Sequence, residues 1–279
     1  MSRRARRGGV SPAVAAVAAV ALAFLVLPLL AVVLRTPWAE LPGLLVSGPV
    51  LEALGLSVLT ALGATALCLL LGAPLAVVLA HSAAWPLLPR RLLRAAVTVP
   101  LVLPPVVGGI ALLLLLGRRG VLGQLLADAG VAIPFTTGAV VLAQTFVAMP
   151  FLVFAVEGAL GAADRRTEAA AATLGATRWQ VFRHVTVPLV APGIAAGAVL
   201  CFTRALGEFG ATITFAGSLP GVTRTLPIAS YLAMQSDPSS AGAMALVLLA
   251  VSVAALIGLR DRWVPGVRVP ARGRREARR

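Results

Sequence analysis

Lysine is absent from this chain of 279 residues, and acidic residues are scarce. All 24 basic residues are arginines, and Asp and Glu together number only ten. A phosphate-binding loop of the G-x-x-x-x-G-K-[ST] type requires its Lys, so the chain cannot hold a standard ATP site of that kind. Lysine Schiff-base chemistry is excluded as well. Any ATP-driven process that involves this chain must therefore take its ATPase from a separate subunit.

Metal-ligating and nucleophilic side chains are also few. The chain has two cysteines, Cys68 and Cys201, and two histidines, His81 and His184. Both cysteines lie in apolar stretches, where such residues are usually small buried hydrophobes. Four residues dispersed in this way do not form a zinc-binding pattern. The sequence thus offers no catalytic group and no metal site, and the chain is not expected to be an enzyme.

Apolar residues are what the chain has in excess. They make up 59% of it, charged residues only 12%, and the mean hydropathy is +0.96. A soluble domain is about 25% charged, so an all-α polytopic membrane protein is predicted. A helix needs roughly 20 apolar residues to cross a bilayer. Six runs meet this length: 12–34, 53–80, 95–117, 129–156 (spanning from about residue 138), 185–203 and 238–259.

These runs predict one six-helix transmembrane domain over residues 12–259. A basic N-terminus, 1–11, precedes it and an Arg-rich tail, 260–279, follows; there is no internal repeat and no separate soluble domain. The first run follows Arg3, Arg4, Arg6 and Arg7, as the apolar part of a signal peptide would. Its 23 residues exceed the usual length of about 7–15, and no clean A-x-A cleavage site follows, so a retained helix is expected.

The distribution of arginine predicts the orientation. Six spans place both termini on one side, with 19 arginines: four in the N-terminus, three in residues 81–94, four in 164–184 and eight in the tail. The opposite side carries four, and Arg204 lies within a span. Basic residues collect in cytoplasmic loops, so both termini are predicted to be cytoplasmic. Topology and attraction to anionic lipid headgroups thus explain the net charge of +14, and nucleic acid is not an expected partner.

The loop between the fourth and fifth spans, about 164–188, predicts two short helices. Asp164 is a plausible N-cap, and Gly175 suits the left-handed position at a helix end. Thr177 can cap the second helix, and Pro188 fits the first turn of the fifth span. The large apolar side chains of the loop are Leu174, Trp179 and Phe182. Such a helix either fits a groove on another protein or lies on the lipid headgroups.

A polar stretch interrupts the fifth span. Arg204 and Glu208 are four residues apart and can neutralise each other, while Gly207 and Gly210 allow close packing or a break in the helix. Charged residues within spans usually face the bundle interior or a water-filled path. The pair therefore either holds the bundle together or belongs to a pathway or gate, where a guanidinium suits an anion.

The loop 164–188 resembles the "EAA" loop of ABC-importer permeases, which reads Glu-Ala-Ala, three residues, Gly, nine residues, aliphatic, any residue, aliphatic, Pro. Gly175, Val185, Val187 and Pro188 match this spacing. Glu168 departs from it, because it lies seven residues before the glycine instead of six. The resemblance implies a coupling loop that docks into a groove of a cytoplasmic ATPase. The residues implicated are Glu168, Ala169, Ala170, Leu174, Gly175, Trp179, Phe182 and Pro188.

Three further stretches resemble the permeases for tetrahedral oxyanions, most closely those for molybdate. They are residues 205–217, residues 220–227 with Tyr231, and residues 100–109, and the likeness covers about residues 51–259. It implies a type I ABC-importer permease fold in the bacterial inner membrane and a homodimer with a central pathway. It also implies two cytoplasmic ATPases, which bind ATP and Mg²⁺, and an extracytoplasmic protein that delivers molybdate or tungstate. No cofactor is expected in this chain.

The expected function is alternating-access import of molybdate driven by the partner's ATP cycle. A sulfate or thiosulfate permease is the first alternative, because these anions are also tetrahedral. A secondary transporter acting alone is less favoured, since only Glu208 and Glu157 could relay protons. The outer loop 218–237, with Arg224, is either part of the docking surface for the binding protein or an ordinary interfacial loop.

Overall fold

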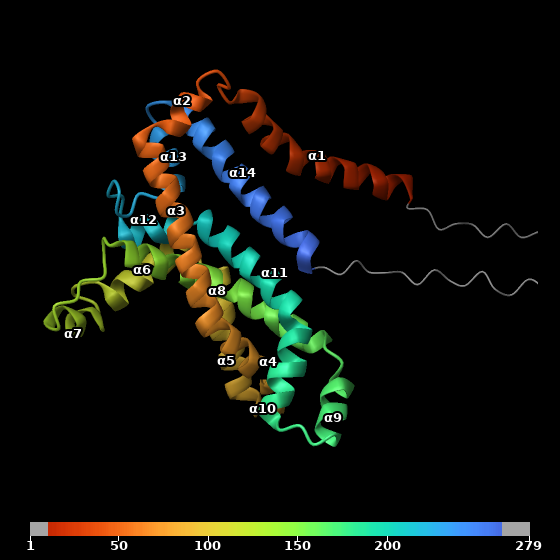
Figure 1. Cartoon of the computed structure of the whole chain (residues 1–279). Helices are drawn as coiled ribbons and strands as arrows, with labels where there is room; N and C mark the ends of the chain where they lie inside the picture. Colours follow the sequence, from red (N-terminus) through yellow and green to blue (C-terminus); the bar gives the residue numbers. More distant parts are fainter. Residues whose placement is uncertain (1–10, 264–279) are drawn as a thin grey trace, which may run out of the picture.

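A computed structural model describes residues 11–263, and all the regular structure within them is helical (Figure 1). The predicted basic N-terminus and most of the Arg-rich tail lie outside these residues. The helices are α1 (Pro12–Arg35), α2 (Leu41–Val46), α3 (Gly48–Leu67), η1 (Cys68–Gly72), α4 (Ala73–His81), η2 (Ser82–Ala84), α5 (Leu87–Val102), α6 (Pro105–Leu116), α7 (Gly123–Asp128), α8 (Thr137–Ala162), α9 (Arg165–Thr173), α10 (Arg178–Val181), η3 (Phe182–Thr186), α11 (Val187–Leu206), α12 (Gly210–Ala216), α13 (Leu226–Ala233) and α14 (Pro238–Trp263).

The predicted all-α membrane architecture is confirmed. Five helical segments in the described part of the chain are long and apolar enough to cross a bilayer, and the number is six when the bent pair α5–α6 is counted as one span. The five are Pro12–Arg35, Gly48–Ala84, Thr137–Ala162, Arg178–Leu206 and Pro238–Gly258. The orientation of the termini remains a prediction.

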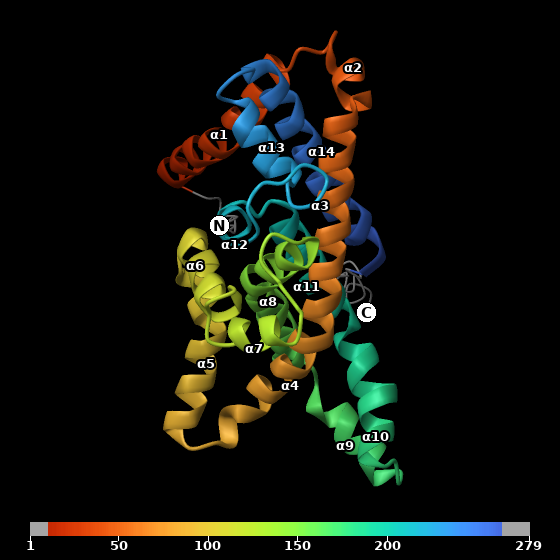
Figure 2. The same ribbon diagram turned by 90° about the vertical axis from the view of Figure 1, so that its left-hand side faces the viewer.

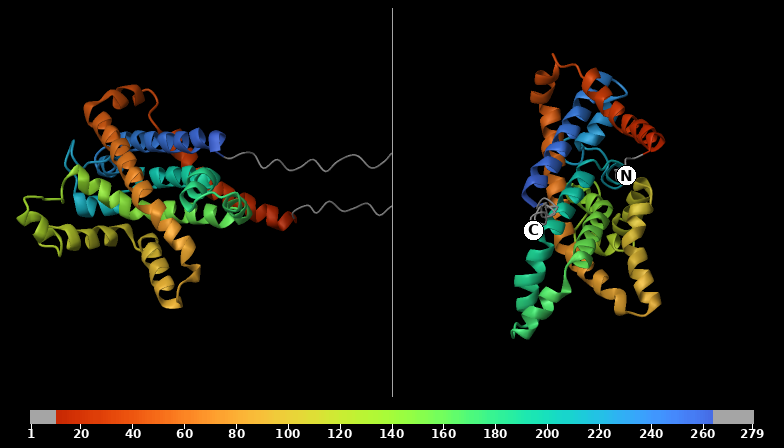
Figure 3. Two further views of the ribbon diagram at one scale, coloured as in Figure 1. Left: turned by 60° about the horizontal axis from the view of Figure 1, so that its bottom comes forward. Right: turned by 90° about the vertical axis from the view of Figure 1, so that its right-hand side faces the viewer.

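The third span differs from the expectation of one helix over residues 95–117. Its two pieces, α5 and α6, are bent by 117° at Leu103–Pro104, and the left view of Figure 3 shows them in brown and yellow. Proline lacks an N–H and biases the preceding residue toward extended backbone. Leu103 accordingly has ψ 135° and Pro104 has ψ 133°. The predicted third span, 95–117, thus corresponds to two helices, which begin at Leu87 and end at Leu116.

Two long spans each contain a π-helical turn that is followed by a proline. η1 precedes Pro74, and η3 precedes Pro188. In η3 the N–H of Val187 donates to the carbonyl of Phe182, five residues back. Pro188 lies in the first turn of α11 as predicted, but α10 and η3 lead into that helix without a break. The fifth span therefore runs from Arg178 to Leu206 and is longer than the predicted 185–203.

The core is built around α8, which packs against α3, α4, α11 and α12. Small residues allow the close approach of these helices: a Cβ on Gly197 would lie 3.0 Å from Ala155 and from Leu152 on α8. Cys68 and Cys201 are free and fully buried in this cluster, as predicted. By contrast, α1 lies at the edge of the bundle (Figure 1), where it packs on α14. It has no buried residue, and most of its large apolar side chains are exposed.

The connections gather at two ends of the bundle. The turn between α4 and α5 lies at the same end as α9 and α10, at the bottom of Figure 2, whereas α2 and α13 lie at the top. Two of the arginine groups assigned to one side of the membrane, those of 81–94 and 164–184, thus lie at the same end of the bundle. Arg90, Arg91 and Arg94 belong to α5 itself, because this helix begins at Leu87.

Candidate functional site

The loop 164–188 folds as its sequence predicts. Asp164 precedes α9, and its Oδ1 accepts a hydrogen bond of 2.9 Å from the N–H of Arg166. Gly175 ends the helix with φ +86°, a conformation that favours glycine, and its ideal Cβ would meet no atom within 4 Å. Thr177 and Gln180 then form a capping box at the start of α10. Local hydrogen bonding thus fixes a sharp turn between two short helices.

The tip of this loop exposes apolar side chains. Leu174 is 88% exposed and Trp179 is 65% exposed. The rings of Trp179 and Phe182 stack with centroids 5.7 Å apart, so they form one apolar face on the second helix. Ala169 and Ala170 are also exposed, on α9. Leu174, Trp179 and Ala170, three of the predicted docking residues, therefore lie on an accessible surface.

Glu168 makes a contact that the sequence pattern did not indicate. Its Oε1 accepts a hydrogen bond of 2.6 Å from the hydroxyl of Thr186, the last residue of η3. Thr186 is only 8% exposed, and Glu168 is partly buried. Glu168 thus binds the base of the fifth span, while Ala170 is exposed away from the cavity.

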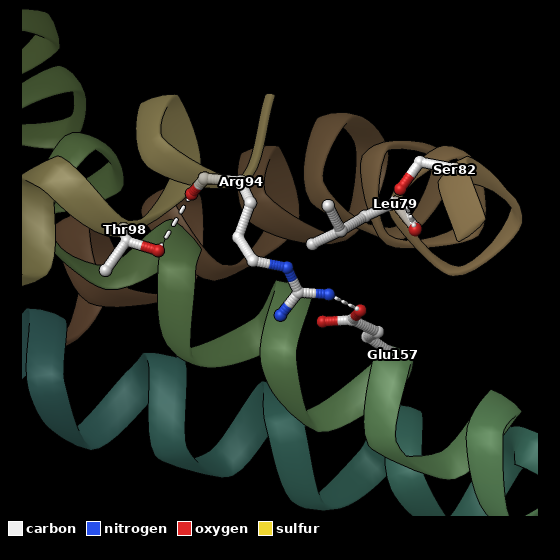
Figure 4. A network of polar contacts seen from close by, with 5 residues as sticks. All are labelled: Leu79, Ser82, Arg94, Thr98 and Glu157. Carbon is white, nitrogen blue, oxygen red and sulfur yellow. Dashed lines mark hydrogen bonds and ion pairs between the residues drawn. The ribbon is translucent and has the colours of Figure 1, made fainter. Parts of the chain in front are cut away.

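A cavity of about 650 Å³ lies behind the loop. Its walls come from the end of α4, the end of α8, α9 and α10. Polar lining residues include His81, Glu157, Glu168 and Arg178. Glu157 is bound by Arg94 of α5, whose Nη2 lies 2.5 Å from its Oε1 (Figure 4). The cavity therefore lies between the loop and the bundle, and two carboxylates, those of Glu157 and Glu168, line it.

The predicted ion pair is present at the break in the fifth span. Arg204 Nη1 lies 2.6 Å from Glu208 Oε2, and the side chain of Glu208 is 1% exposed against 27% for Arg204. The α-helix stops at Leu206 and resumes at Gly210. The other oxygen of Glu208 accepts a 2.9 Å hydrogen bond from the N–H of Ala211. Glu208 thus caps α12 as well as binding Arg204, and the second role was not foreseen.

The breaks in the third and fifth spans pack against each other. A Cβ on Gly109 of α6 would lie 2.8 Å from the carbonyl oxygen of Ala211, and one on Gly210 would lie 2.9 Å from Pro105. Both glycines therefore allow a backbone approach that a side chain would block. Sequence reasoning singled out both stretches but gave no reason to place them together. The two interrupted helices form one structural unit beside the ion pair.

Buried polar side chains on α8 and α12 lie near this unit. Gln144 and Thr212 are both fully buried. Within the described residues, neither the amide atoms of Gln144 nor the hydroxyl of Thr212 has a hydrogen-bond partner. Burial of an amide without a hydrogen-bond partner costs free energy, so Gln144 is a candidate functional residue beside this unit. Its place within an apolar run gave no signal in the sequence.

The loop 218–237, predicted to lie on the outer side, is held by hydrogen bonds between its own residues. Arg224 donates to the hydroxyl and the carbonyl of Ser218 at 3.1 and 3.3 Å. The loop is also fixed to the bundle, because Leu226 N–H donates to Ser57 on α3 and Thr137 donates to the carbonyl of Val222. Arg224 thus uses two of its hydrogen-bond donors within the loop, and its role in docking remains a prediction.

Comparisons with known proteins identify a matching family and similar permeases. The family described as "Binding-protein-dependent transport system inner membrane component" matches residues 72–269. A "Molybdenum transport system permease protein ModB" of Mycobacterium bovis is 49% identical over 241 residues, which cover 86% of this chain and 90% of that protein. The protein of the same name in Escherichia coli K12 is 43% identical over 66% of this chain and 81% of its own length.

Two solved structures show the same fold at low sequence identity. A bacterial alginate ABC transporter in complex with its periplasmic protein is similar with a TM-score of 0.65 and 18% identity, over 86% of this chain and 88% of that one. The MetNI methionine ABC transporter gives a TM-score of 0.55 and 18% identity, over 77% of this chain and 96% of that one. The chain is therefore a multi-pass membrane protein that belongs to the family of binding-protein-dependent transport system inner membrane components.

Proposed function

We propose that this chain is the permease subunit of an ATP-driven ABC importer of molybdate, with tungstate as a second substrate. The observation that carries the proposal is the 49% identity, over 86% of the chain, to a protein named for molybdenum transport. Nothing in the described structure favours sulfate or thiosulfate as the cargo. The chain supplies the transport pathway, and two copies of a partner ATPase hydrolyse ATP.

The partners follow from surfaces that the single chain leaves open. The exposed Leu174, Trp179 and Phe182 support docking of an ATPase at the cytoplasmic loop. The faces of α5 and α6 also expose apolar side chains, which suits lipid on one side and a second copy of this chain on the other. The outer loop with Arg224 is the proposed contact for an extracytoplasmic molybdate-binding protein.

The fifth span supplies the mechanical connection. The continuous helix Arg178–Leu206 has 29 residues, and at about 1.5 Å per residue it extends roughly 40 Å. One end carries the coupling loop, and the other end carries the break with Arg204 and Glu208. Movement of the docked loop is transmitted to this helix. Because α12 packs closely on α6, the displacement also reaches the broken third span, and the two subunits open alternately to either side.

The ion pair suits passage of an anion without tight binding. Glu208 neutralises Arg204, so the site carries little net charge. The guanidinium is partly exposed, and its remaining N–H donors can bind an anion in a water-filled pathway. Selectivity for molybdate then comes from the binding protein.

Competition between anions tests the substrate. The chain is reconstituted in vesicles with its ATPase and binding protein, and uptake of labelled molybdate is measured with unlabelled molybdate, tungstate or sulfate present. Molybdate and tungstate are expected to compete at low concentration and sulfate only in large excess. Competition by sulfate that is as strong as competition by molybdate would overturn the assignment. Vesicles that lack the binding protein are the control.

A further inference from the structure

Packing does not hold helix α9, the first helix of the coupling loop, against the bundle. Among its residues whose side chains are described, none is buried. Ala169 and Ala172 face the cavity of about 650 Å³, and Val77 and Leu160 of the bundle line it as well. Apolar contact therefore does little to couple movements of α9 to movements of the membrane helices.

A hydrogen bond provides the missing connection. Glu168 lies on α9, and Thr186 lies 18 residues later at the end of η3, where the hydroxyl donates to the carboxylate at 2.6 Å. Hydrogen bonds to an ionised acceptor are shorter and stronger than neutral ones. Among the side chains that the structure describes, none forms an ion pair with Glu168, although Arg178 lines the same cavity. Among these side chains, the hydroxyl of Thr186 is the hydrogen-bond partner of this carboxylate.

The position of Thr186 matters because the backbone beside it is a weak point. The π turn η3 replaces the regular hydrogen bonds, and Pro188 lacks the N–H that would bind the carbonyl of His184. Helices bend most readily at such places. A displacement of α9 that passed only through the turn at Gly175 and then through η3 would be absorbed there. The Glu168–Thr186 contact bypasses the turn at Gly175 and most of η3, and it reaches the residue immediately before α11.

We infer that Glu168 and Thr186 are positioning residues, whose hydrogen bond transmits movement of the ATPase-docked loop to the fifth span. This inference rests on the proposed function. It assigns Glu168 a role within the permease instead of a contact with the ATPase. It also accounts for a departure in the sequence, because the glutamate that lies one position early is the one that faces Thr186.

The test measures molybdate uptake per ATP hydrolysed in the reconstituted complex. Thr186→Val and Glu168→Ala are each expected to lower this ratio by a factor of at least about ten, the lower end of the range for loss of a hydrogen bond to a charged group. The double variant is expected to be no worse than either single variant, because both remove the same contact. Thr186→Ser keeps the donor and should recover most of the coupling, whereas Glu168→Gln keeps an acceptor without its charge and should recover part of it.

The matched control is Thr173→Val, since the hydroxyl of Thr173 bonds only to the carbonyl of Ala170 within its own helix. It should couple normally. Normal coupling in Thr186→Val, together with loss of coupling in Glu168→Gln, would show that the carboxylate binds a basic group on the ATPase and would overturn the inference. If Thr186→Val does not insert, Thr186→Ala removes the same hydroxyl and carries the same prediction. Absence of ATP-dependent uptake in the unmodified complex would instead contradict the proposed function.

Discussion

Removal of Arg204 would leave a buried carboxylate without its partner. Glu208 is 1% exposed and its Oε2 lies 2.6 Å from the guanidinium. Breaking a buried ion pair by removing one partner costs about 3–5 kcal/mol, and because Arg204 is 27% exposed we expect the lower end, roughly 3 kcal/mol. For a domain of this size each kcal/mol shifts the melting temperature by about 2–4 °C, so Arg204→Ala should melt roughly 6–12 °C lower.

The second variant removes the charge of Glu208 and keeps its cap. Glu208→Gln retains an oxygen that can accept from Ala211 N–H, whereas Glu208→Ala would lose that hydrogen bond too. The double variant Arg204→Ala/Glu208→Gln should therefore recover most of the melting temperature. The assay is thermal unfolding of the detergent-purified chain at a fixed scan rate.

Two results separate the roles of the pair. A double variant as unstable as Arg204→Ala, or an Arg204→Ala chain with unchanged melting temperature, would refute the reasoning about neutralisation. A double variant that is stable but transports no molybdate would assign Arg204 to the pathway. The single variant Glu208→Gln should be milder than Arg204→Ala, since the charge it leaves unpaired is partly exposed.

Further outcomes are expected elsewhere in the chain. Gly210→Ala should lower the stability by about 1–3 kcal/mol in the same unfolding assay, because its Cβ would lie 2.9 Å from α6; Gly242→Ala, which meets nothing within 4 Å, is the neutral control. Gly175→Pro should abolish transport without preventing insertion, since φ +86° is closed to proline, and normal uptake would contradict this. Trp179→Ala should weaken co-purification of the ATPase, whereas unchanged co-purification would argue against docking at this face. Hydrogen bonds from neighbouring serines lower the pKa of Asp237 to about 2, so the stability it contributes is complete above its ordinary pKa and is lost only as the pH falls through about 2. The difference in melting temperature between Asp237→Ala and the unmodified chain should therefore stay constant between about pH 5 and pH 8, and a difference that shrinks within this range would contradict the assignment.

Local features of the fold could be predicted from the sequence because their causes are local. Asp164, Gly175 and Thr177 act through hydrogen bonds and backbone angles within a few residues, and each lies where its chemistry requires. The spans follow from apolar length alone. The i, i+4 spacing likewise placed Arg204 beside Glu208.

Features that depend on packing between distant segments could not be predicted. The third span contains Pro100, Pro104 and Pro105, and a proline in a membrane helix produces either a kink or a full break, depending on its neighbours. The close approach of Gly109 and Gly210 joins helices about a hundred residues apart, and the contact of Glu168 with Thr186 depends on how α9 folds back. The buried, unpaired Gln144 gave no periodic signal at all.

Accumulation of molybdate against its gradient tests the central claim most directly. Vesicles contain this chain, its ATPase and the binding protein, with ATP supplied on the side of the coupling loop. Uptake is expected only with hydrolysable ATP, and Gly175→Pro vesicles should show none. Accumulation driven by an ion gradient, by the chain alone and without any ATPase, would contradict the account.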